Sequence, residues 1–203
     1  MPDRSLRRAD LAAEPMEQFA RWFEEARASG QPEPEAMAMA TATADSRPSV
    51  RFVLLRGFDE RGFVFYTNRS SRKGAEIGAN PWAAAAFRWQ VVDRQVRVNG
   101  PIAAVSDAES DAYFASRPRG SQIGAWASEQ SRVADGREVI DGRLAEFAAR
   151  FEGAPVPRPP WWGGYRLAPR EVEFWQQGTF RLHDRFRYRK EAVGPWQIER
   201  LFP

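Results

Sequence analysis

The sequence contains no cysteine and a single histidine, His183. Without cysteine the chain has no disulfide framework, no thiolate nucleophile and no cysteine-ligated metal. One histidine is too few for a typical zinc site, so a metal centre is not expected. The pattern Gly-x-Ser-x-Gly, which presents a nucleophilic serine, is also missing. If the protein is an enzyme, these absences favour a bound organic cofactor as the carrier of the chemistry.

Long apolar runs are missing as well. The longest candidate, residues 83–87, is far shorter than the roughly 20 residues that a membrane-spanning helix needs. Residues 1–8 are charged and lead into an amphipathic segment, without the apolar stretch of a secretion signal. We therefore expect a cytoplasmic protein that does not act at a membrane.

Lysine is scarce, because Lys73 and Lys190 are the only two and nearly all the positive charge is arginine. The net charge is only +3, and basic residues alternate with acidic ones instead of forming a stripe. Nucleic-acid binding is therefore not expected. A general compositional bias is the favoured explanation of the arginines. The alternative is that some of them form bidentate clamps for phosphate groups.

The hydrophobic fraction of 43% suits a folded domain, and we expect one domain over residues 1–203. The expected helices cover residues 14–28, 71–78, 107–116, 121–127 and 135–151. The expected strands cover residues 36–44, 50–58, 62–67, 82–89, 94–105, 165–175, 185–189 and 196–201. Consecutive strands, with helices near the start and in the middle, predict a mainly β fold, an antiparallel barrel with helices packed outside. A Rossmann sheet is disfavoured because strands and helices do not alternate.

The first group of candidate site residues lies between Arg51 and Lys73. On a regular strand Arg51 and Arg56 have opposite parity, so they are expected to face opposite sides. Ser71, Arg72 and Lys73 lie where a strand gives way to a helix, and Ser71 suits the N-cap. Backbone N–H groups at a helix start, joined by two cations, suit a phosphate. A solvated loop with a helix cap is the alternative.

A second group comprises Tyr113, Arg117 and Ser121. Tyr113 and Arg117 are four residues apart and lie on one face of the expected helix. Ser121 follows in the turn before the next helix. A phenol, a guanidinium and a hydroxyl together suit a phosphate pocket. The alternative is a tyrosine that packs on an arginine stem at a helix end.

The third group follows Trp175. Arg181, His183 and Arg185 are spaced by two residues and would share one face of an extended segment. Such a face is either solvent-exposed or lines a ligand site, because unpartnered polar groups are costly to bury. Trp175 offers an aromatic surface for a planar ring. His183 by itself also fits an ordinary hydrogen-bonded histidine.

Together and in this order, the motifs resemble the pyridoxine/pyridoxamine 5'-phosphate oxidase family over nearly the whole chain. The stretches Ser116-Arg-Pro-Arg, Ser121-Gln-Ile-Gly-Ala-Trp and Arg181-Leu-His-Asp-Arg carry the resemblance. It implies an FMN-binding split β-barrel and a homodimer in which both subunits build each of two FMN sites. Residues from about 162 to 203 would form the dimerisation and active-site segment. The implied reaction oxidises pyridoxamine or pyridoxine 5'-phosphate to pyridoxal 5'-phosphate and reduces O2 to H2O2.

The resemblance also implies roles for individual residues. FMN would be held by Arg51, Phe52, Val53, Leu54, Leu55, Arg56, Tyr66, Thr67, Arg72, Lys73, Gln95, Gln130, Ser131, Trp175 and Arg185. The substrate phosphate would be bound by Arg56, Tyr113, Arg117 and Ser121. Arg181 and His183 would lie over the pyridine ring near the reacting carbon, as the catalytic pair.

Two departures from the family pattern and two alternatives accompany the resemblance. The family usually has lysine where this chain has Arg56, and a guanidinium is bulkier and planar. An Arg-x-Glu-Tyr segment usually precedes the first helix, and no such pattern lies before Glu14. One alternative is a related split-barrel flavoprotein with another substrate, such as a phenazine-pathway oxidase or a deazaflavin-dependent reductase. The other is a non-catalytic carrier of FMN or pyridoxal phosphate.

Overall fold

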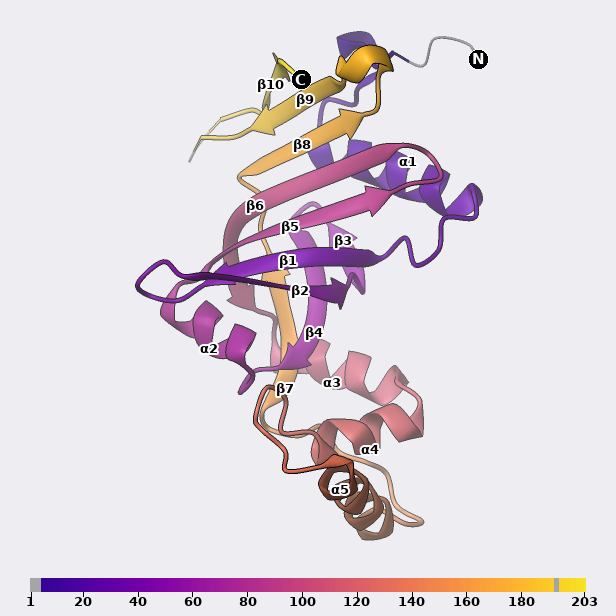
Figure 1. The fold of residues 1–203 in the computed structure, drawn as a ribbon, viewed down its shortest axis with the longest axis vertical. Coiled ribbons are helices and arrows are strands. Elements are labelled where there is room, and N and C mark those ends of the chain that lie inside the picture. Colours follow the sequence, from indigo (N-terminus) through magenta and orange to yellow (C-terminus); the bar gives the residue numbers. More distant parts are fainter. Residues whose placement is uncertain (1–4, 192–193) are drawn as a thin grey trace.

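The structure is a computed structural model that describes residues 5–191 and 194–203 (Figure 1). The helices, of which the two labelled η are 3₁₀-helices, are η1 (Arg8–Asp10), α1 (Pro15–Ala28), α2 (Arg72–Ala79), α3 (Asp107–Ser116), α4 (Arg119–Ala127), α5 (Arg137–Arg150) and η2 (Thr179–Arg181). The strands are β1 (Ala36–Ala42), β2 (Pro48–Leu54), β3 (Gly57–Asp59), β4 (Gly62–Asn68), β5 (Trp82–Trp89), β6 (Arg94–Ala104), β7 (Trp162–Leu167), β8 (Glu171–Gln176), β9 (Asp184–Arg189) and β10 (Gln197–Leu201).

The strands form one curled antiparallel sheet. Its main path runs β10-β9-β8-β6-β5-β1-β2, and β7 joins both β6 and β4 away from this path. Figure 1 shows β4 and β7 descending from the sheet toward α3, α4 and α5, which lie together at one end of the molecule. The expected mainly β architecture, an antiparallel split barrel with helices outside, is confirmed.

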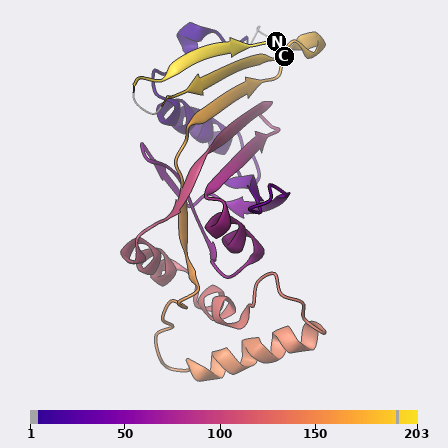
Figure 2. The same ribbon diagram turned by 90° about the vertical axis from the view of Figure 1, so that its left-hand side faces the viewer.

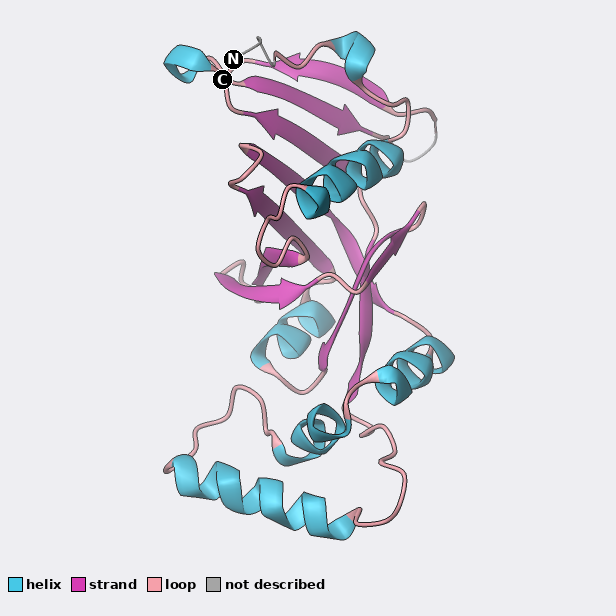
Figure 3. Ribbon diagram, turned by 90° about the vertical axis from the view of Figure 1, so that its right-hand side faces the viewer, coloured by secondary structure: helices cyan, strands magenta, loops and turns pink. Residues whose placement is uncertain are grey.

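The main core lies between this sheet and α1. In β1 and β5 alternate side chains are buried, as expected for strands with one face on a core. Phe19 of α1 packs edge-on against Phe58 and Phe63, with ring centroids 5.0 and 4.8 Å away, and contacts Phe87 and Trp89 at smaller interplanar angles of 55° and 46°. Figure 3 shows α1 lying across the strands. This packing fixes α1 against the sheet.

A smaller core joins the helical end to the sheet. Phe114, Ile123, Phe147, Phe151 and Trp162 are buried together there. Figure 2 shows α5 lying across the end of the molecule, apart from the strands. Among the described residues, no helix is both long enough and apolar enough to cross a membrane.

Two expected strands are each split in two, although the ends of the other expected elements lie within two residues of the observed ones. Strand 50–58 is broken after Leu54: the Leu55 N–H still bonds to Glu35 O, but the Arg56 N–H bonds to Val64 O on β4. The chain thus changes its pairing partner from β1 to β4, and strand alternation does not continue through the break. The expectation of opposite faces for Arg51 and Arg56 assumed one regular strand and does not apply across this break, and both residues line one pocket.

The other split and one further correction lie near the C-terminus. The expected strand 165–175 is interrupted between Leu167 and Glu171, where the chain leaves β4 and begins to pair with β9. Arg181 does not belong to an extended segment, because it ends η2 with a positive φ of 65°. Arg181, His183 and Arg185 therefore do not share the face of one strand, and only Arg185 lies in β9.

Candidate active site

A cavity of about 780 Å³ lies between the β2 and β4 strands, the start of α2, and the α3–α4 helices. Its volume is within the range of about 300–1,000 Å³ typical of cofactor and small-molecule sites. The predicted site residues that line it are Arg51, Phe52, Val53, Leu54, Arg56, Tyr66, Thr67, Arg72, Lys73, Tyr113, Arg117, Ser121, Gln130 and Ser131. Folding therefore brings the first and second groups of candidate residues into one pocket.

Lys73 is the most deeply buried cation of the pocket, with 7% of the residue exposed. Its Nζ donates hydrogen bonds to Gln130 Oε1 at 2.7 Å, Thr67 Oγ1 at 3.1 Å and Ser71 Oγ at 3.2 Å. All three acceptors are neutral. Burial, together with the nearby charge of Arg51, lowers the pKa of Lys73 to about 8. An anion that enters the pocket would therefore stabilise the charged form of Lys73.

The local sequence places Lys73 in the first turn of α2. Ser71 caps this helix by accepting a hydrogen bond from the Gly74 N–H, which confirms the predicted N-cap. Gly74 is required here because a Cβ atom would lie 2.0 Å from the carbonyl oxygen of Arg69. The tight turn therefore directs the helix start and its cations toward the cavity.

Glu76, which sequence analysis missed, organises the arginines at this end of the pocket. Only 4% of Glu76 is exposed. Its Oε2 accepts from the Arg51 guanidinium at 3.2 Å and from Thr41 and Ser49, and its Oε1 accepts from Arg72 Nε at 2.9 Å. Burial raises the pKa of this carboxyl, but these hydrogen bonds outweigh burial and lower the pKa to about 2. The sequence did contain a signal for this ion pair, because Arg72 and Glu76 are four residues apart and such residues are neighbours on a helix surface.

Arg117 marks the other end of the pocket. Its Nη1 atom is buried without a hydrogen-bond partner among the described residues. The guanidinium carbon lies 4.7 Å from the centroid of the Trp162 ring. Burial lowers the pKa of Arg117, the Tyr113 hydroxyl acts in the opposite direction, and the charge of Arg56 lowers the pKa further. An unpartnered buried donor beside a second cation is a suitable position for a ligand anion.

Stacked aromatic rings line the pocket beside Arg117. Tyr66 and Tyr113 stack with centroids 4.0 Å apart and planes inclined by 15°. Trp162 lies nearly parallel to both, at 5.6 Å from Tyr66 and 6.1 Å from Tyr113. Sequence analysis identified the two tyrosines but missed Trp162, because a tryptophan at a strand start gives no site signal by itself.

The remaining predicted residues do not line this pocket within one chain. Leu55 belongs to the main core. Gln95, Trp175 and Arg185 are direct neighbours across β6, β8 and β9. The His183 ring lies 4.6 Å from the Trp175 ring. These residues, with Arg181 nearby in sequence, form what we call the C-terminal cluster: Gln95, Trp175, Arg181, His183 and Arg185.

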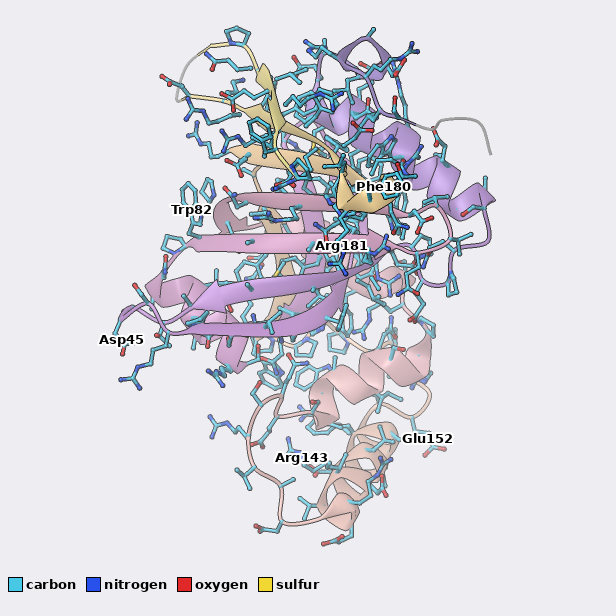
Figure 4. The ribbon with its side chains drawn as sticks, turned by 45° about the horizontal axis from the view of Figure 1, so that its top comes forward. Asp45, Trp82, Arg143, Glu152, Phe180 and Arg181 are labelled. Carbon is cyan, nitrogen blue, oxygen red and sulfur yellow. The ribbon has the colours of Figure 1, made fainter. Side chains whose placement is uncertain are left out.

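Partners within the chain fix part of this C-terminal cluster. His183 Nδ1 accepts a hydrogen bond of 3.3 Å from the Gly178 N–H. Arg185 Nε donates to Glu173 Oε1 at 2.8 Å, and this hydrogen bond raises the pKa of Arg185. In Figure 4 Arg181 and Phe180 lie beside the sheet, whereas the labelled Arg143 and Glu152 mark the helical end.

Comparison with known proteins identifies the family. The model of the family described as pyridoxamine 5'-phosphate oxidase matches residues 23–151, and that of the pyridoxine 5'-phosphate oxidase C-terminal dimerisation region matches residues 162–203. The chain belongs to the pyridoxamine 5'-phosphate oxidase family. A family member from Rubrobacter xylanophilus, named pyridoxine/pyridoxamine 5'-phosphate oxidase, is 58% identical, over 98% of this chain and 94% of its own length. A protein of the same name from Cupriavidus pinatubonensis is 56% identical, over 98% and 93%.

Two solved structures resemble this family member. PhzG from Burkholderia lata, in complex with tetrahydrophenazine-1-carboxylic acid, has a TM-score of 0.92 at 34% identity and covers 100% of both chains. A pyridoxamine 5'-phosphate oxidase-related, FMN-binding protein from Nostoc punctiforme has a TM-score of 0.73 at 17% identity, with 95% of this chain and 100% of that chain covered. The second likeness shows the shared fold.

Proposed function

We propose that this family member oxidises pyridoxamine 5'-phosphate or pyridoxine 5'-phosphate to pyridoxal 5'-phosphate, with FMN as cofactor and O2 as final electron acceptor. For the amine substrate, O2 and water are consumed, and the aldehyde, ammonia and H2O2 are released. Two curated relatives that share more than half of their residues with this chain are named for these substrates.

The observation that carries the proposal is a pair of separate cation sets in one pocket. Arg51, Arg72 and Lys73 lie at one end, where Lys73 hydrogen-bonds to neutral groups. Arg56 and Arg117 lie at the other end, where the buried Arg117 Nη1 has no hydrogen-bond partner in the part of the chain that the structure describes. Two phosphate-binding ends suit a pocket that takes a phosphorylated cofactor and a phosphorylated substrate together.

The residues at the first end fit the phosphate of FMN. Lys73 provides a buried ammonium, and Arg51 and Arg72 are held by the carboxylate of Glu76. Gln130 brings the loop after α4 onto Lys73 and closes this end. Bound FMN would supply a two-electron acceptor for oxidation of the substrate at C4', with O2 as the final acceptor.

The second end fits the phosphate of the substrate. Arg117, Tyr113 and Ser121 come from the end of α3 and the start of α4, and Arg56 follows the break after β2. Arg56 keeps the positive charge of the lysine usual in the family, so we expect phosphate binding to persist. Anchoring the phosphate at a fixed place orients the pyridine ring for reaction.

We further propose that the protein is a homodimer in which the C-terminal cluster of one subunit completes the pocket of the other. Most of the C-terminal cluster lies in the segment that matches the dimerisation region. Next to it, the side chain of Phe180 is 93% exposed in the single chain. Arg181 would orient the substrate ring and stabilise developing charge, His183 would help to position the ring, and Gln95, Trp175 and Arg185 would contact the cofactor.

An aerobic assay of the FMN-loaded protein with pyridoxamine 5'-phosphate tests the function, with peroxide and aldehyde followed together. Equal amounts of both products are expected. Flavin binding without either product would contradict the oxidase and favour a carrier. Oxidation of tetrahydrophenazine-1-carboxylic acid in preference to the phosphorylated substrate would instead favour a phenazine-pathway role, which the likeness to PhzG makes the second candidate. Arg117 and Arg56 argue for the phosphorylated substrate.

A further inference from the structure

Trp162 joins the proposed substrate end of the pocket to the smaller core. It is the first residue of β7, pairs with Asn68 of β4, and is 6% exposed. The same ring lines the pocket and packs edge-on against Phe114 of α3, with centroids 5.1 Å apart. Its backbone is held in place as well, because Arg158 Nη1 donates a hydrogen bond of 2.7 Å to Trp162 O.

The contact between Trp162 and Arg117 differs from the contacts of the other pocket arginines. Arg51 and Arg72 both bond to the carboxylate of Glu76, which neutralises part of their charge. Arg117 instead lies over the π face of Trp162 at 4.7 Å. A π face holds a cation in place without cancelling its charge as a carboxylate does. Arg117 therefore keeps its charge, and its Nη1, which has no hydrogen-bond partner within residues 5–191 and 194–203, is available to an incoming anion.

Trp162 also aligns the tyrosine of the same end. Its ring is nearly parallel to Tyr113, with planes inclined by 6°, and to Tyr66, with planes inclined by 9°. Tyr113 and Arg117 lie on one face at the end of α3, so a single ring contacts both. Removing the indole would leave the guanidinium with only the more distant Phe114 ring, at 5.5 Å, and the phenol with only its stacking on Tyr66.

We propose that Trp162 is a positioning residue for the substrate phosphate, which holds Arg117 and Tyr113 in the arrangement that binds a phosphate monoester. The proposal rests on the proposed function and deepens it, because it names the source of selectivity for phosphorylated over unphosphorylated pyridines. Trp162 itself makes no bond to the phosphate. It acts by fixing two groups that do.

The competing interpretation is that Trp162 only fills the smaller core. In that case its loss lowers stability and affects all substrates to the same extent. Trp126 provides a matched control, because it packs against Phe147 and Phe151 of the same core but does not line the pocket. Trp126→Leu therefore removes a tryptophan from this core and leaves the Trp162–Arg117 contact intact.

The experiment compares Trp162→Leu, Trp162→Phe and Trp126→Leu in the FMN-loaded protein. The first readout is the ratio of kcat/KM for pyridoxamine 5'-phosphate to kcat/KM for pyridoxamine. The second, independent of turnover, is the calorimetric Kd of pyridoxal 5'-phosphate compared with that of pyridoxal. We expect Trp162→Leu to lower the kcat/KM ratio about five- to thirtyfold, mainly through KM. Trp162→Phe, which keeps a weaker π face, should give an intermediate ratio. Trp126→Leu should give the same ratio as the unsubstituted protein.

An unchanged ratio and an unchanged preference for pyridoxal 5'-phosphate in Trp162→Leu would overturn the positioning role, as would an equal fall in Trp126→Leu. If Trp162→Leu does not fold, Trp162→Phe serves as the test. A kcat/KM ratio in Trp162→Phe equal to that of the unsubstituted protein then overturns the proposal. If the unsubstituted protein does not oxidise pyridoxamine 5'-phosphate, the proposed function fails, and the calorimetric comparison still decides the role of Trp162.

Discussion

Lys73 Nζ donates a hydrogen bond of 2.7 Å to Gln130 Oε1, which joins the start of α2 to the loop after α4. These residues are 57 positions apart in the chain. The bond closes one end of the pocket with a buried cation that hydrogen-bonds to neutral oxygens. The properties of this end can therefore be tested through the titration of a single lysine.

Cofactor affinity should depend on pH through Lys73. Its pKa of about 8 means that the ligand-free pocket loses a positive charge above pH 8. The Kd of FMN, measured by flavin fluorescence, should rise between pH 7 and pH 9.5, whereas the Kd of riboflavin, which lacks the phosphate, should not follow this step. Lys73→Arg should remove the step. A parallel rise for riboflavin would contradict the assignment of this end to a phosphate.

The same lysine should affect the stability of the ligand-free protein. Its pKa in the folded state, about 8, lies below the ordinary value of 10.5, so the unfolded chain binds the proton more tightly. Charged Lys73 thus costs folding free energy below pH 8, and this cost is relieved as pH rises from 8 to 10.5. Urea unfolding between pH 8 and pH 10.5 should show the free energy of unfolding rising with pH in the unsubstituted protein but not in Lys73→Met.

Removal of Glu76 should destabilise the protein strongly. Glu76→Ala leaves the largely buried Arg51 without its carboxylate, and breaking a buried pair costs about 3–5 kcal/mol, whereas the loss of the pair with the exposed Arg72 adds little. The control is Glu17→Ala, which breaks the exposed pair with Arg21 and should cost about 0.5 kcal/mol or less. Urea unfolding at pH 7 measures both. Equally small losses of unfolding free energy in Glu76→Ala and Glu17→Ala would show that Glu76 does not organise the pocket.

Acid should weaken the contribution of Glu76 in a defined range. Its pKa is about 2 in the folded protein and 4.5 ordinarily, so its stabilising effect is present above pH 4.5 and is lost as pH falls toward 2. The difference in unfolding free energy between the unsubstituted protein and Glu76→Gln should therefore shrink over this interval. A difference that stays constant from pH 5 to pH 2.5 would contradict the assigned shift.

Arg117→Ala should impair use of the phosphorylated substrate without loss of the cofactor. A hydrogen bond to a charged group contributes about 1.5–3 kcal/mol, so kcat/KM for pyridoxamine 5'-phosphate should fall about 10- to 150-fold. The Kd of FMN should remain the same, because the other end of the pocket holds its phosphate. Arg137→Ala, on the exposed face of α5, serves as the control. An equal loss of FMN affinity would contradict two separate phosphate ends.

A shared site predicts complementation between two impaired variants. In a heterodimer of Arg117→Ala and Arg181→Ala subunits, one site carries both substitutions and the other carries neither. With differently tagged, co-expressed subunits, the purified heterodimer should show about half the turnover of the unsubstituted dimer, whereas each homodimer variant stays impaired. A heterodimer no more active than its parents would place the C-terminal cluster and the pocket in the same chain's site.

Local signals in the sequence were sufficient for most elements and for many pocket residues. Helix α1 follows from its apolar spacing, and α3 begins at the Ser106–Glu109 capping box, which the structure shows. Such features depend on residues within one or two turns, so they can be read without knowledge of the rest of the fold. Tyr113 and Arg117 share a face for the same reason.

Tertiary structure alone decided how these pieces meet. The break after Leu54 arises because the chain exchanges β1 for β4 as a pairing partner, and this exchange depends on how the sheet closes. It is this break that brings Arg56 into the pocket with Arg51.

The partners of the pocket cations were likewise hidden in the sequence. Glu76 neutralises Arg51 from a different element, and Trp162 contacts Arg117, which lies 45 positions away in the chain. The sequence by itself determined the family, the helix caps and the chemical groups available for two phosphates, because these depend on residue identity and short spacing. Only the tertiary structure decided which cations are neutralised and which remain free for a ligand, because burial and charge pairing arise between segments distant in the chain.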